Sequence, residues 1–311
     1  MYALLEIVLP IFAVVFTGWI VGRFEIIKGE RINGLADFTF FIAIPALMFR
    51  SVVRSIRWET ADPGVLLAYF GSGLVVYGIA LIVGLRVFKI SFEEAAMLGL
   101  ACTFGNSVQL GIPMVVRTFG EHGLVPLMLI ISFHSLVLIG LTTVLIEIAR
   151  GRGGGAKAAA LQSAKGAAKN PIIIAMVAGL ITAAFDVELP RMADDFLALL
   201  GASGIPCALF ALGAQLSRFR FGGYWRPTAA ILVLKLAVLP ALAWGFGLGL
   251  ELPPETAAVA ILGAGLPTGA NVFILANRYR VYEAPVVSSV VASTALSLAT
   301  ITLLIAWLTP L

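Results

Sequence analysis

This chain contains a series of apolar stretches, each about 20 residues long. Charged residues or clusters of proline and glycine separate these stretches. Runs of this length are typical of membrane-spanning helices, because about 20 helical residues cross the hydrocarbon core of a bilayer. We therefore predict an all-α integral membrane protein with ten transmembrane helices, numbered segments 1 to 10. The segments cover residues 2–22, 35–53, 65–85, 95–116, 124–149, 171–186, 196–217, 227–250, 256–277 and 284–308.

Segments 4 and 9 carry polar residues, glycine and proline where an unbroken helix in lipid needs apolar side chains. Segment 4 contains FGNSVQLGIPMVV (104–116), and segment 9 contains most of GAGLPTGANVFILANRY (263–279). Pro113 and Pro267 have no N–H, so each leaves a carbonyl one turn earlier without its helical partner. Such a break must be covered by protein or line a wet cavity, because an unpaired carbonyl facing lipid is costly. We expect both segments to be broken and to cross near the bilayer midplane.

Interruptions recur at matching places in the two halves of the chain. Segment 2 contains IPALMF (44–49) and segment 7 contains IPCALF (205–210), and the broken segments 4 and 9 are also five apart. Five is an odd number, so two homologous halves must have opposite orientations in the membrane. We predict a 5+5 inverted repeat of residues 1–149 and 171–311. A basic, Gly/Ala-rich cytoplasmic linker at 150–170 joins them.

A crossing of two broken helices predicts a binding site for a small anion. The second half of each segment begins at the crossing, where a helix N-terminus offers about +0.5 of an elementary charge and unpaired N–H donors. Asn106 and Asn271 are placed to cap freed backbone groups or to hold carboxylate oxygens. The carbonyls that end the first halves could hold a cation. The predicted substrate-binding residues are Asn106, Gln109, Pro113, Pro267, Thr268 and Asn271.

Composition excludes several other classes of protein. Of the 311 residues 60% are hydrophobic and only 12% are charged, roughly half the charged share of a soluble domain. The net charge of +4 does not indicate nucleic acid, because the basic residues lie in loops between segments. Cys102 and Cys207 lie inside apolar segments, so neither a disulfide nor a cysteine metal site is expected. The chain has none of the common hydrolase or metalloprotease motifs, so we expect no enzymatic activity and no cofactor.

Lysine and arginine are distributed unequally between the two sides of the membrane. Fifteen of the 21 lie in loops after odd-numbered segments, five lie in loops on the other side, and Lys235 lies within segment 8. Positively charged loops stay in the cytoplasm, so this pattern predicts that both termini face outward. Segment 1 has no basic leader before it, so we expect it to be retained as a helix.

Three polar residues inside other segments are candidates for ion coupling or for support of the site. Lys235 is central in segment 8, where a charge is costly; it pairs with a carboxylate, stabilises the crossing through carbonyls or contacts substrate. His134 in segment 5 either carries a proton or is a hydrogen-bonded interior side chain. Gln215, near the cytoplasmic end of segment 7, is a candidate to face the substrate path. Arg50, near the outer face, either guides anions into a vestibule or extends to the interface.

The residues around both breaks resemble the auxin efflux carrier family, which includes plant auxin exporters and bacterial proteins described as malonate or other carboxylate permeases. PTGANVFILANRY (267–279) matches the family run P-T-x-A-N-x-F-x-L-A-x-R-Y, and residues 105–113 match G-N-x-x-x-x-G-x-P. LKLAVLP (234–240) is similar to the Lys-bearing eighth segment of the family. The resemblance covers the whole chain.

The resemblance implies a fold similar to that of the bile acid/sodium symporters. Segments 1, 2, 6 and 7 would form a scaffold, and segments 3–5 and 8–10 a transport domain that moves as an elevator. It also implies a homodimer through the scaffold and a location in the bacterial cytoplasmic (inner) membrane. After Asn106 this chain has Ser107, Val108 and Gln109, where many family members have Thr-Gly and an aromatic residue. The pocket therefore differs chemically, which argues against an aromatic, auxin-like substrate.

Together these features predict a secondary-active or potential-driven transporter of small organic anions, chiefly carboxylates. Two alternatives stay open: a membrane module that senses an organic anion without moving it, and a sodium-coupled symporter of the bile acid type. Na+ or H+ is the candidate coupling ion; residues 104–116 and 263–279 contain no acidic residue, but neutral oxygens also bind Na+. The expected partners are the substrate anion, the lipid bilayer and a second copy of the chain, without nucleic acid.

The charge distribution makes the orientation testable. We expect a reporter fused to the C-terminus to be active outside the cytoplasm, because the excess of lysine and arginine holds the opposite loops inside. Reporter activity in the cytoplasm would reverse the orientation of every segment.

Overall fold

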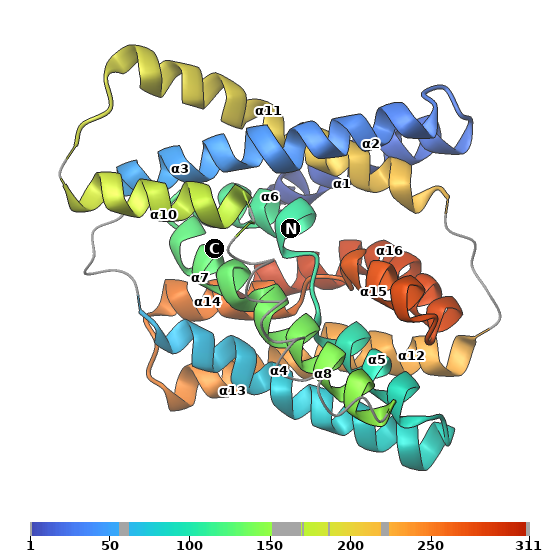
Figure 1. Ribbon diagram of the computed structural model, residues 1–311. Coiled ribbons are helices and arrows are strands. Elements are labelled where there is room, and N and C mark those ends of the chain that lie inside the picture. The colour runs from blue at the N-terminus through green and yellow to red at the C-terminus, as the bar shows by residue number, and fades with distance from the viewer. Residues whose placement is uncertain are drawn as a thin grey trace. The chain divides into compact units, whose positions relative to one another are not determined.

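The computed structural model describes residues 2–55, 62–150, 169, 171–185, 187–218 and 224–308. Every regular element in these residues is a helix, and the one β-type contact among them is an isolated bridge (Figure 1). The all-α class is thus confirmed for the described part of the chain. The linker predicted at 150–170 lies almost entirely outside it.

Six helices in the described residues are long and apolar enough to cross a membrane, judged by length and composition. Their mean hydropathy lies between 1.7 and 2.4, and they correspond to predicted segments 2, 3, 5, 7, 8 and 10. The six are Gly29–Arg54, Gly64–Phe88, Leu124–Ala149, Arg191–Leu216, Trp225–Gly249 and Glu283–Leu308. Shorter apolar helices occur within segments 1, 6 and 9. They are Leu9–Arg23, Pro171–Ala184 and Pro254–Ala264.

Four of the six long helices contain a π-helical turn. They run α2 (Gly29–Phe38), η1 (Thr39–Ala43), α3 (Ile44–Ser55); α4 (Gly64–Ile82), η3 (Val83–Phe88); α7 (Leu124–His134), η5 (Ser135–Ile139), α8 (Gly140–Ala149); and α12 (Trp225–Val233), η6 (Leu234–Val238), α13 (Leu239–Gly249). Single π turns inside α-helices are frequent at functional sites. Lys235 lies in η6 and His134 directly precedes η5. Two polar residues singled out by the sequence therefore lie where the helix departs from α geometry.

The helices pack into two compact units. Unit 1 consists of Met1–Asp62, Val108–Met128 and Ala168–Phe219, and thus contains segments 1, 2, 6 and 7 with the second half of segment 4. Unit 2 consists of Pro63–Ser107, Leu129–Ala167 and Arg220–Leu311. It contains segments 3, 8, 9 and 10, the first half of segment 4 and most of segment 5.

Unit 1 is built from two helix pairs. α1 (Tyr2–Arg23) packs along α11 (Arg191–Leu216), and α10 (Pro171–Ala184) packs along α3; Figure 1 shows the second pair side by side. α3 also contacts α11, so the two pairs join into one bundle. Each pair combines one helix from the first half of the chain with one from the second.

Glycines bring α1 and α11 close together. A Cβ atom on Gly213 would overlap the carbonyl oxygen of Val15, and one on Gly18 would overlap that of Phe210. Helices in membranes pack through small residues of this kind, because lipid gives no hydrophobic gain to larger ones. Only glycine therefore fits these positions at the observed helix separation.

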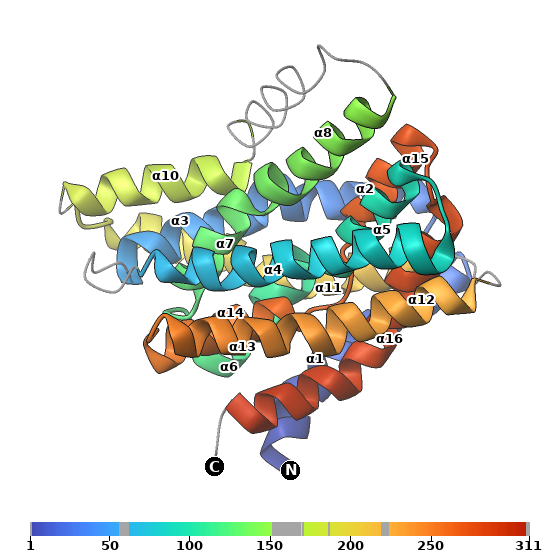
Figure 2. The same ribbon diagram turned by 90° about the horizontal axis from the view of Figure 1, so that it is seen from below.

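Unit 2 is centred on α4, which packs against α13 and α5 (Phe92–Thr103), while α13 also packs against α14 (Pro254–Ala264) (Figure 2). α12 contacts α16 (Glu283–Leu308), and α5 contacts α8. The Tyr77 hydroxyl of α4 donates to the carbonyl of Ala96, 2.8 Å away, and lies 2.9 Å from the Thr142 hydroxyl of α8. These buried bonds fix α5 between its two neighbours.

The start of α5 is set by its own sequence. Ser91 accepts a bond from the Glu94 amide at 3.2 Å, and the Glu94 carboxylate accepts one from the Ser91 amide at 3.0 Å. This reciprocal capping box satisfies two of the free amides at the helix N-terminus. The N-terminal end of α5 is thus closed, in contrast to its C-terminal end at the break in segment 4.

The close contacts at Gly213 predict how an added methyl group changes the stability of the protein. We expect Gly213→Ala to lower the stability of the purified protein by about 1–3 kcal/mol, because the new Cβ must push α1 away from α11. Thermal unfolding in detergent measures the change. Gly34→Ala in α2 is the control, because its Cβ would meet nothing within 4 Å. An unchanged melting temperature for Gly213→Ala would mean that this helix contact is looser than described.

Candidate functional site

Both predicted breaks are present. In segment 4, α5 ends at Thr103, residues 104–106 are extended, and the chain then continues through η4 (Ser107–Gly111) into α6 (Ile112–Phe119). In segment 9, α14 ends at Ala264 and α15 (Asn271–Tyr279) starts after six non-helical residues. Each segment thus consists of two shorter helical parts separated by irregular backbone. This is expected where the sequence is rich in glycine, asparagine and proline.

The two breaks meet. Gly105 and Thr268 form an isolated antiparallel bridge. The Asn106 amide donates to the carbonyl of Pro267 at 2.9 Å, and the Gly269 amide donates to that of Phe104 at 3.0 Å. We call residues 104–106 and 267–269 together the crossing. Backbone groups that each helix cannot satisfy are therefore satisfied by the other break, which is the condition for irregular backbone away from water.

Glycines permit this approach as well. A Cβ on Gly269 would lie 3.0 Å from the Phe104 ring and 3.1 Å from the carbonyl oxygen of Gly105. A Cβ on Gly105 would lie 3.3 Å from the carbonyl oxygen of Gly263. Both distances are tight, so larger residues would separate the two strands of the crossing.

Thr268 holds the crossing through contacts on both sides. Its hydroxyl donates to the carbonyl of Ala101 in α5 at 3.0 Å, and its amide donates to the Ser293 hydroxyl of α16 at 3.0 Å. Thr268 and Ser293 are both fully buried. Thr268 was predicted to bind substrate, but its hydroxyl and amide hydrogens both bond to groups inside the protein.

Ser293 was missed by the sequence analysis. It belongs to a row of buried hydroxyl residues on α16 that also contains Ser288, Ser289, Thr294 and Ser297. Such a row in an apolar segment marks the helix face that packs against protein, since hydroxyls bond across helix contacts in membranes. The row of hydroxyl residues can be seen in the sequence. The hydrogen-bond partner of Ser293, the amide of Thr268, cannot be found from the sequence.

The two asparagines have different environments. Asn106 is buried at 7% exposure, whereas Asn271 is exposed at the start of α15. Asn271 does not cap the helix: the N-cap residue is Ala270, and it makes no side-chain cap bond. In the described residues the Asn271 side chain and amide have no hydrogen-bond partner. The expected capping role of Asn271 is therefore wrong, and its donors stay open at the positive end of α15.

Pro113 does not mark the break. It lies inside the helical run 107–119, directly after the π turn η4, so the helix departs from α geometry in the turn before this proline. The break precedes it, at residues 104–106, and the π turn η4 containing Gln109 separates the two. Gln109 and Pro113 belong to unit 1, whereas Asn106, Pro267 and Asn271 belong to unit 2.

Lys235 reaches the crossing from η6. Its side chain is completely buried, and its ammonium donates to the carbonyl of Ala264, the last residue of α14, at 2.6 Å. A Cβ on Gly105 would lie 3.5 Å from the same nitrogen. Of the roles predicted from the sequence, contact with a backbone carbonyl, that of Ala264 next to the crossing, is the one observed.

His134 also lies beside the crossing. Its Nε2 is 3.0 Å from the Tyr69 hydroxyl, and its ring stacks on Phe104 with the centroids 4.1 Å apart. His134 and Tyr69 are both buried. The hydrogen-bonded interior role is therefore present, and it supports the extended conformation of Phe104. Gln215, by contrast, lies in α11 of unit 1 and is half-buried.

The far end of α15 is fixed by Arg150. Its guanidinium donates to the carbonyl of Tyr279 and to the Glu93 carboxylate, both at 2.9 Å. A cation near a helix C-terminus is stabilised by the negative end of the helix dipole. Nearby, burial and then the Glu94 carboxylate raise the pKa of Tyr282, so this phenol stays neutral. The α15 helix is thus anchored at its C-terminal end and open at its N-terminal end.

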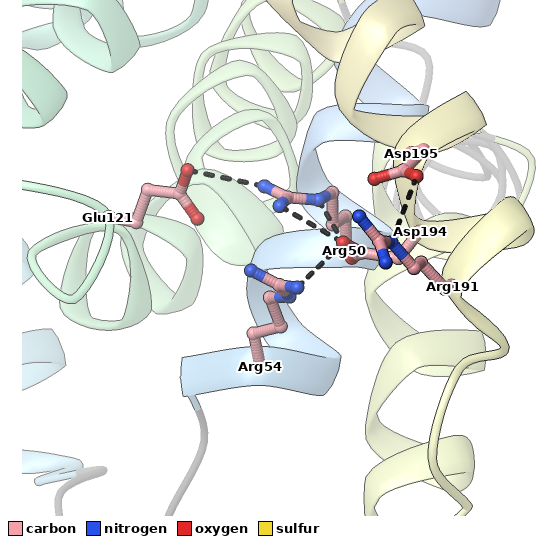
Figure 3. A network of polar contacts seen from close by, with 6 residues as sticks. All are labelled: Arg50, Arg54, Glu121, Arg191, Asp194 and Asp195. Atoms are coloured by element: carbon pink, nitrogen blue, oxygen red, sulfur yellow. Dashed lines mark hydrogen bonds and ion pairs between the residues drawn. The ribbon is translucent and has the colours of Figure 1, made fainter.

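A separate ion-pair network lies in unit 1 (Figure 3). Arg50 of α3 pairs with Asp194 of α11 at 2.9 Å and with Glu121 at 3.5 Å, and Arg54 pairs with Asp194 at 2.6 Å. Two cations and two carboxylates balance one another, and Asp194 is buried. The charge of Arg50 is therefore engaged, which argues against an open guide for anions. No group of three His, Cys, Asp or Glu side chains in the described residues is arranged to hold a metal ion.

Comparison with known proteins agrees with these features. The model of a family described as "Membrane transport protein" matches residues 3–305. The chain is 29% identical to the "Putative malonate transporter" of Rhizobium meliloti (strain 1021), over 95% of this chain and 93% of that protein. It is 22% identical to "Auxin efflux carrier component 8" of Arabidopsis thaliana, over 96% and 95%. A match of 26% to the "Lysosomal cholesterol signaling protein" of Mus musculus covers 75% of this chain and 28% of that protein.

The bond between Thr268 and Ser293 predicts a difference between two serines of the same helix. We expect Ser293→Ala to lower stability by about 1–3 kcal/mol, because it leaves the buried amide of Thr268 unpaired. Ser289→Ala removes an equally buried hydroxyl that bonds only to Val286 of its own helix, so it should cost clearly less. Thermal unfolding of both variants decides the matter, and equal losses would contradict the assigned role of Ser293.

Proposed function

Because this chain belongs to the membrane transport protein family, which includes the auxin efflux carriers, we propose that it is a secondary transporter of small organic anions, with the substrate bound at the crossing. The single observation that carries the proposal is the meeting of two broken helices through backbone hydrogen bonds. Interrupted helices in corresponding segments of two halves are the best sequence-level pointer to a transporter's binding site.

The electrostatics of the crossing favour an anion. The open amide and side chain of Asn271 lie at the N-terminus of α15, whose dipole attracts negative charge. Lys235 adds a full positive charge beside Gly105. Residues 104–106 and 265–271 contain no carboxylate to oppose it. Asn106 and Asn271 are the side chains that we propose contact the substrate.

A carboxylate is the substrate class that fits these donors. Amide N–H groups and helix N-termini bind carboxylate oxygens through charge-assisted bonds, which are stronger than bonds between neutral groups. The relative from Rhizobium meliloti carries malonate in its name, and a small dicarboxylate is the first probe to use. The residues after Asn106 differ from those of the auxin exporters, which favours a small substrate over an aromatic one.

Two observations support the ten-segment inverted repeat as the architecture. α1 pairs with α11 and α3 pairs with α10, so segments 1 and 7 pair as segments 2 and 6 do, which a two-fold relation between the halves requires. The breaks in segments 4 and 9 are the second matched pair. Both termini outside, a homodimer and the bacterial inner membrane complete this proposal.

The packing into units supports an elevator mechanism. Segments 1, 2, 6 and 7 fall in unit 1, which fits a scaffold, and segments 3, 8, 9 and 10 fall in unit 2, which fits a transport domain. Val108–Met128 packs with unit 1 and departs from the simple assignment of segments 3–5 to the transport domain. The crossing lies wholly in unit 2, so a bound anion would travel with one rigid body.

Transport of an anion out of the cell needs no coupling ion. At a membrane potential of about −100 mV, moving one negative charge outward gains roughly 2.3 kcal/mol, which is a concentration ratio of about fifty. The direction of net flux then follows from the gradient and the potential.

A sensor that binds an anion without moving it is the second candidate. The likeness to a protein named for cholesterol signaling favours this reading. Counterflow separates the two functions, because only a carrier exchanges labelled substrate across a sealed bilayer.

We expect purified protein in proteoliposomes to take up labelled malonate against a trans pool of unlabelled malonate. Asn271→Ala and Asn106→Ala should each lower the apparent affinity roughly 10- to 100-fold, because each removes a hydrogen bond to a charged group. Asn277→Ala is the matched control, since this exposed asparagine lies at the other end of α15 and bonds to Glu283. Normal transport by both of the first two variants would refute the site, and absent exchange with intact binding would favour the sensor.

A further inference from the structure

Lys235 is the most unusual buried group in unit 2. Its side chain is 0% exposed in the middle of a long apolar helix, Trp225–Gly249. Charged side chains at such positions are rare and expensive, and they are usually paired and functional. The question is therefore what neutralises this ammonium.

No carboxylate does so among the described residues. None of their ion pairs includes Lys235, and the carboxylates of unit 2 lie at helix ends or in loops, as in Glu93, Glu94 and Glu255. The titratable groups that interact with Lys235 are Cys102 of α5 and His134 of α7. Neither side chain is a carboxylate, so within the described part of the chain the ammonium has no carboxylate counter-ion.

A backbone carbonyl at the end of a helix supplies a partial negative charge instead. The ammonium donates to the carbonyl of Ala264 at 2.6 Å, where α14 ends, and it lies beside Gly105, two residues after α5 ends. A helix C-terminus carries about −0.5 of an elementary charge. The end of α14 therefore offers a partial negative charge directly to the ammonium, through the carbonyl of Ala264.

The same surroundings would suit an alkali metal ion. Half-helix C-termini and unwound carbonyls at a crossing are the ligands that hold such ions in transporters with broken helices. Here the nitrogen of Lys235 occupies that place, and Ala264 is already bonded to it. A second cation at the same point would meet the repulsion of the first.

We propose that the Lys235 ammonium is a tethered cation that takes the place of an alkali metal ion and holds the crossing together. It is a positioning residue: it fixes Ala264 and the Gly105 backbone so that the opposite, positive end of α15 keeps its orientation. The chain thus carries its own cation, and the fold of the crossing needs none from solution. This inference does not depend on the proposed function; only its consequence, sodium-independent transport, does.

Thermal unfolding in detergent tests the tethered cation directly. We expect the wild-type melting temperature to be equal in sodium, potassium and N-methylglucamine chloride at one ionic strength. Lys235→Met keeps most of the volume without the charge, so its melting temperature should fall by roughly 5 °C or more in all three salts. Lys89→Met removes an exposed lysine of the same unit and should change nothing.

Chemical rescue distinguishes a missing charge from a missing side chain. Lys235→Ala leaves room for a small cation, so sodium or ethylammonium should raise its melting temperature in a saturable way, whereas N-methylglucamine is too large to do so. The wild type should respond to neither. A merely space-filling lysine would not produce this response.

Three results would overturn the proposal: a wild type stabilised saturably by sodium, a Lys235→Met protein as stable as wild type, or a Lys235→Ala protein that ignores both small cations. If neither variant folds, the wild-type comparison decides, since sodium-dependent stability contradicts a filled cation position and equal stability supports it. Malonate counterflow should proceed equally in sodium and N-methylglucamine. Absent counterflow would sink the proposed function and leave the thermal test valid.

Discussion

The pairing of backbone groups away from water is the constraint on which the rest of this structure depends. A helix that stops inside an apolar segment leaves amides and carbonyls without partners, and lipid offers none. Here the two breaks lie against each other and pair their backbone groups. The Asn106 amide donates to the carbonyl of Pro267, and the Gly269 amide donates to that of Phe104. Thr268 adds hydrogen bonds from the crossing to Ala101 of α5 and to Ser293 of α16. The packing of these helices therefore depends on the irregular backbone between them.

The crossing also separates two kinds of charge. The end of α14 presents the carbonyl of Ala264, to which Lys235 donates from inside the protein, while at the end of α5 the carbonyl of Ala101 accepts from Thr268. The start of α15 presents the open amide and side chain of Asn271, whereas the amides of the next three residues are bonded to carbonyls. In the proposed site the cation belongs to the chain and the anion position is open, so the expected bias toward negative ligands would come from chain geometry rather than from a cluster of arginines. The arginines of unit 1, by contrast, are engaged with Asp194 and Glu121.

Much of this arrangement could be predicted from local sequence. Helix length, the breaks and the polar residues at them follow from hydropathy and from the chemistry of glycine and proline, and they were found. Errors arose where a residue has two plausible local uses: Pro113 lies in the helical run after the break rather than at the break, and Asn271 leaves its helix uncapped. Contacts between distant parts of the chain, such as Arg50 with Asp194 or His134 with Phe104, depend on packing and leave no local pattern.

The lysine in the eighth segment has a consequence for biogenesis. The translocon receives Trp225–Gly249 before Ala264 has left the ribosome, so the ammonium enters the bilayer without the oxygen that later binds it. A central lysine opposes insertion by about 2.5–3.5 kcal/mol, and the surrounding apolar residues, chiefly leucine and alanine, offset this cost in a helix of mean hydropathy 2.0. Stable integration of segment 8 would then depend on segment 9, which brings the carbonyl of Ala264 to Lys235.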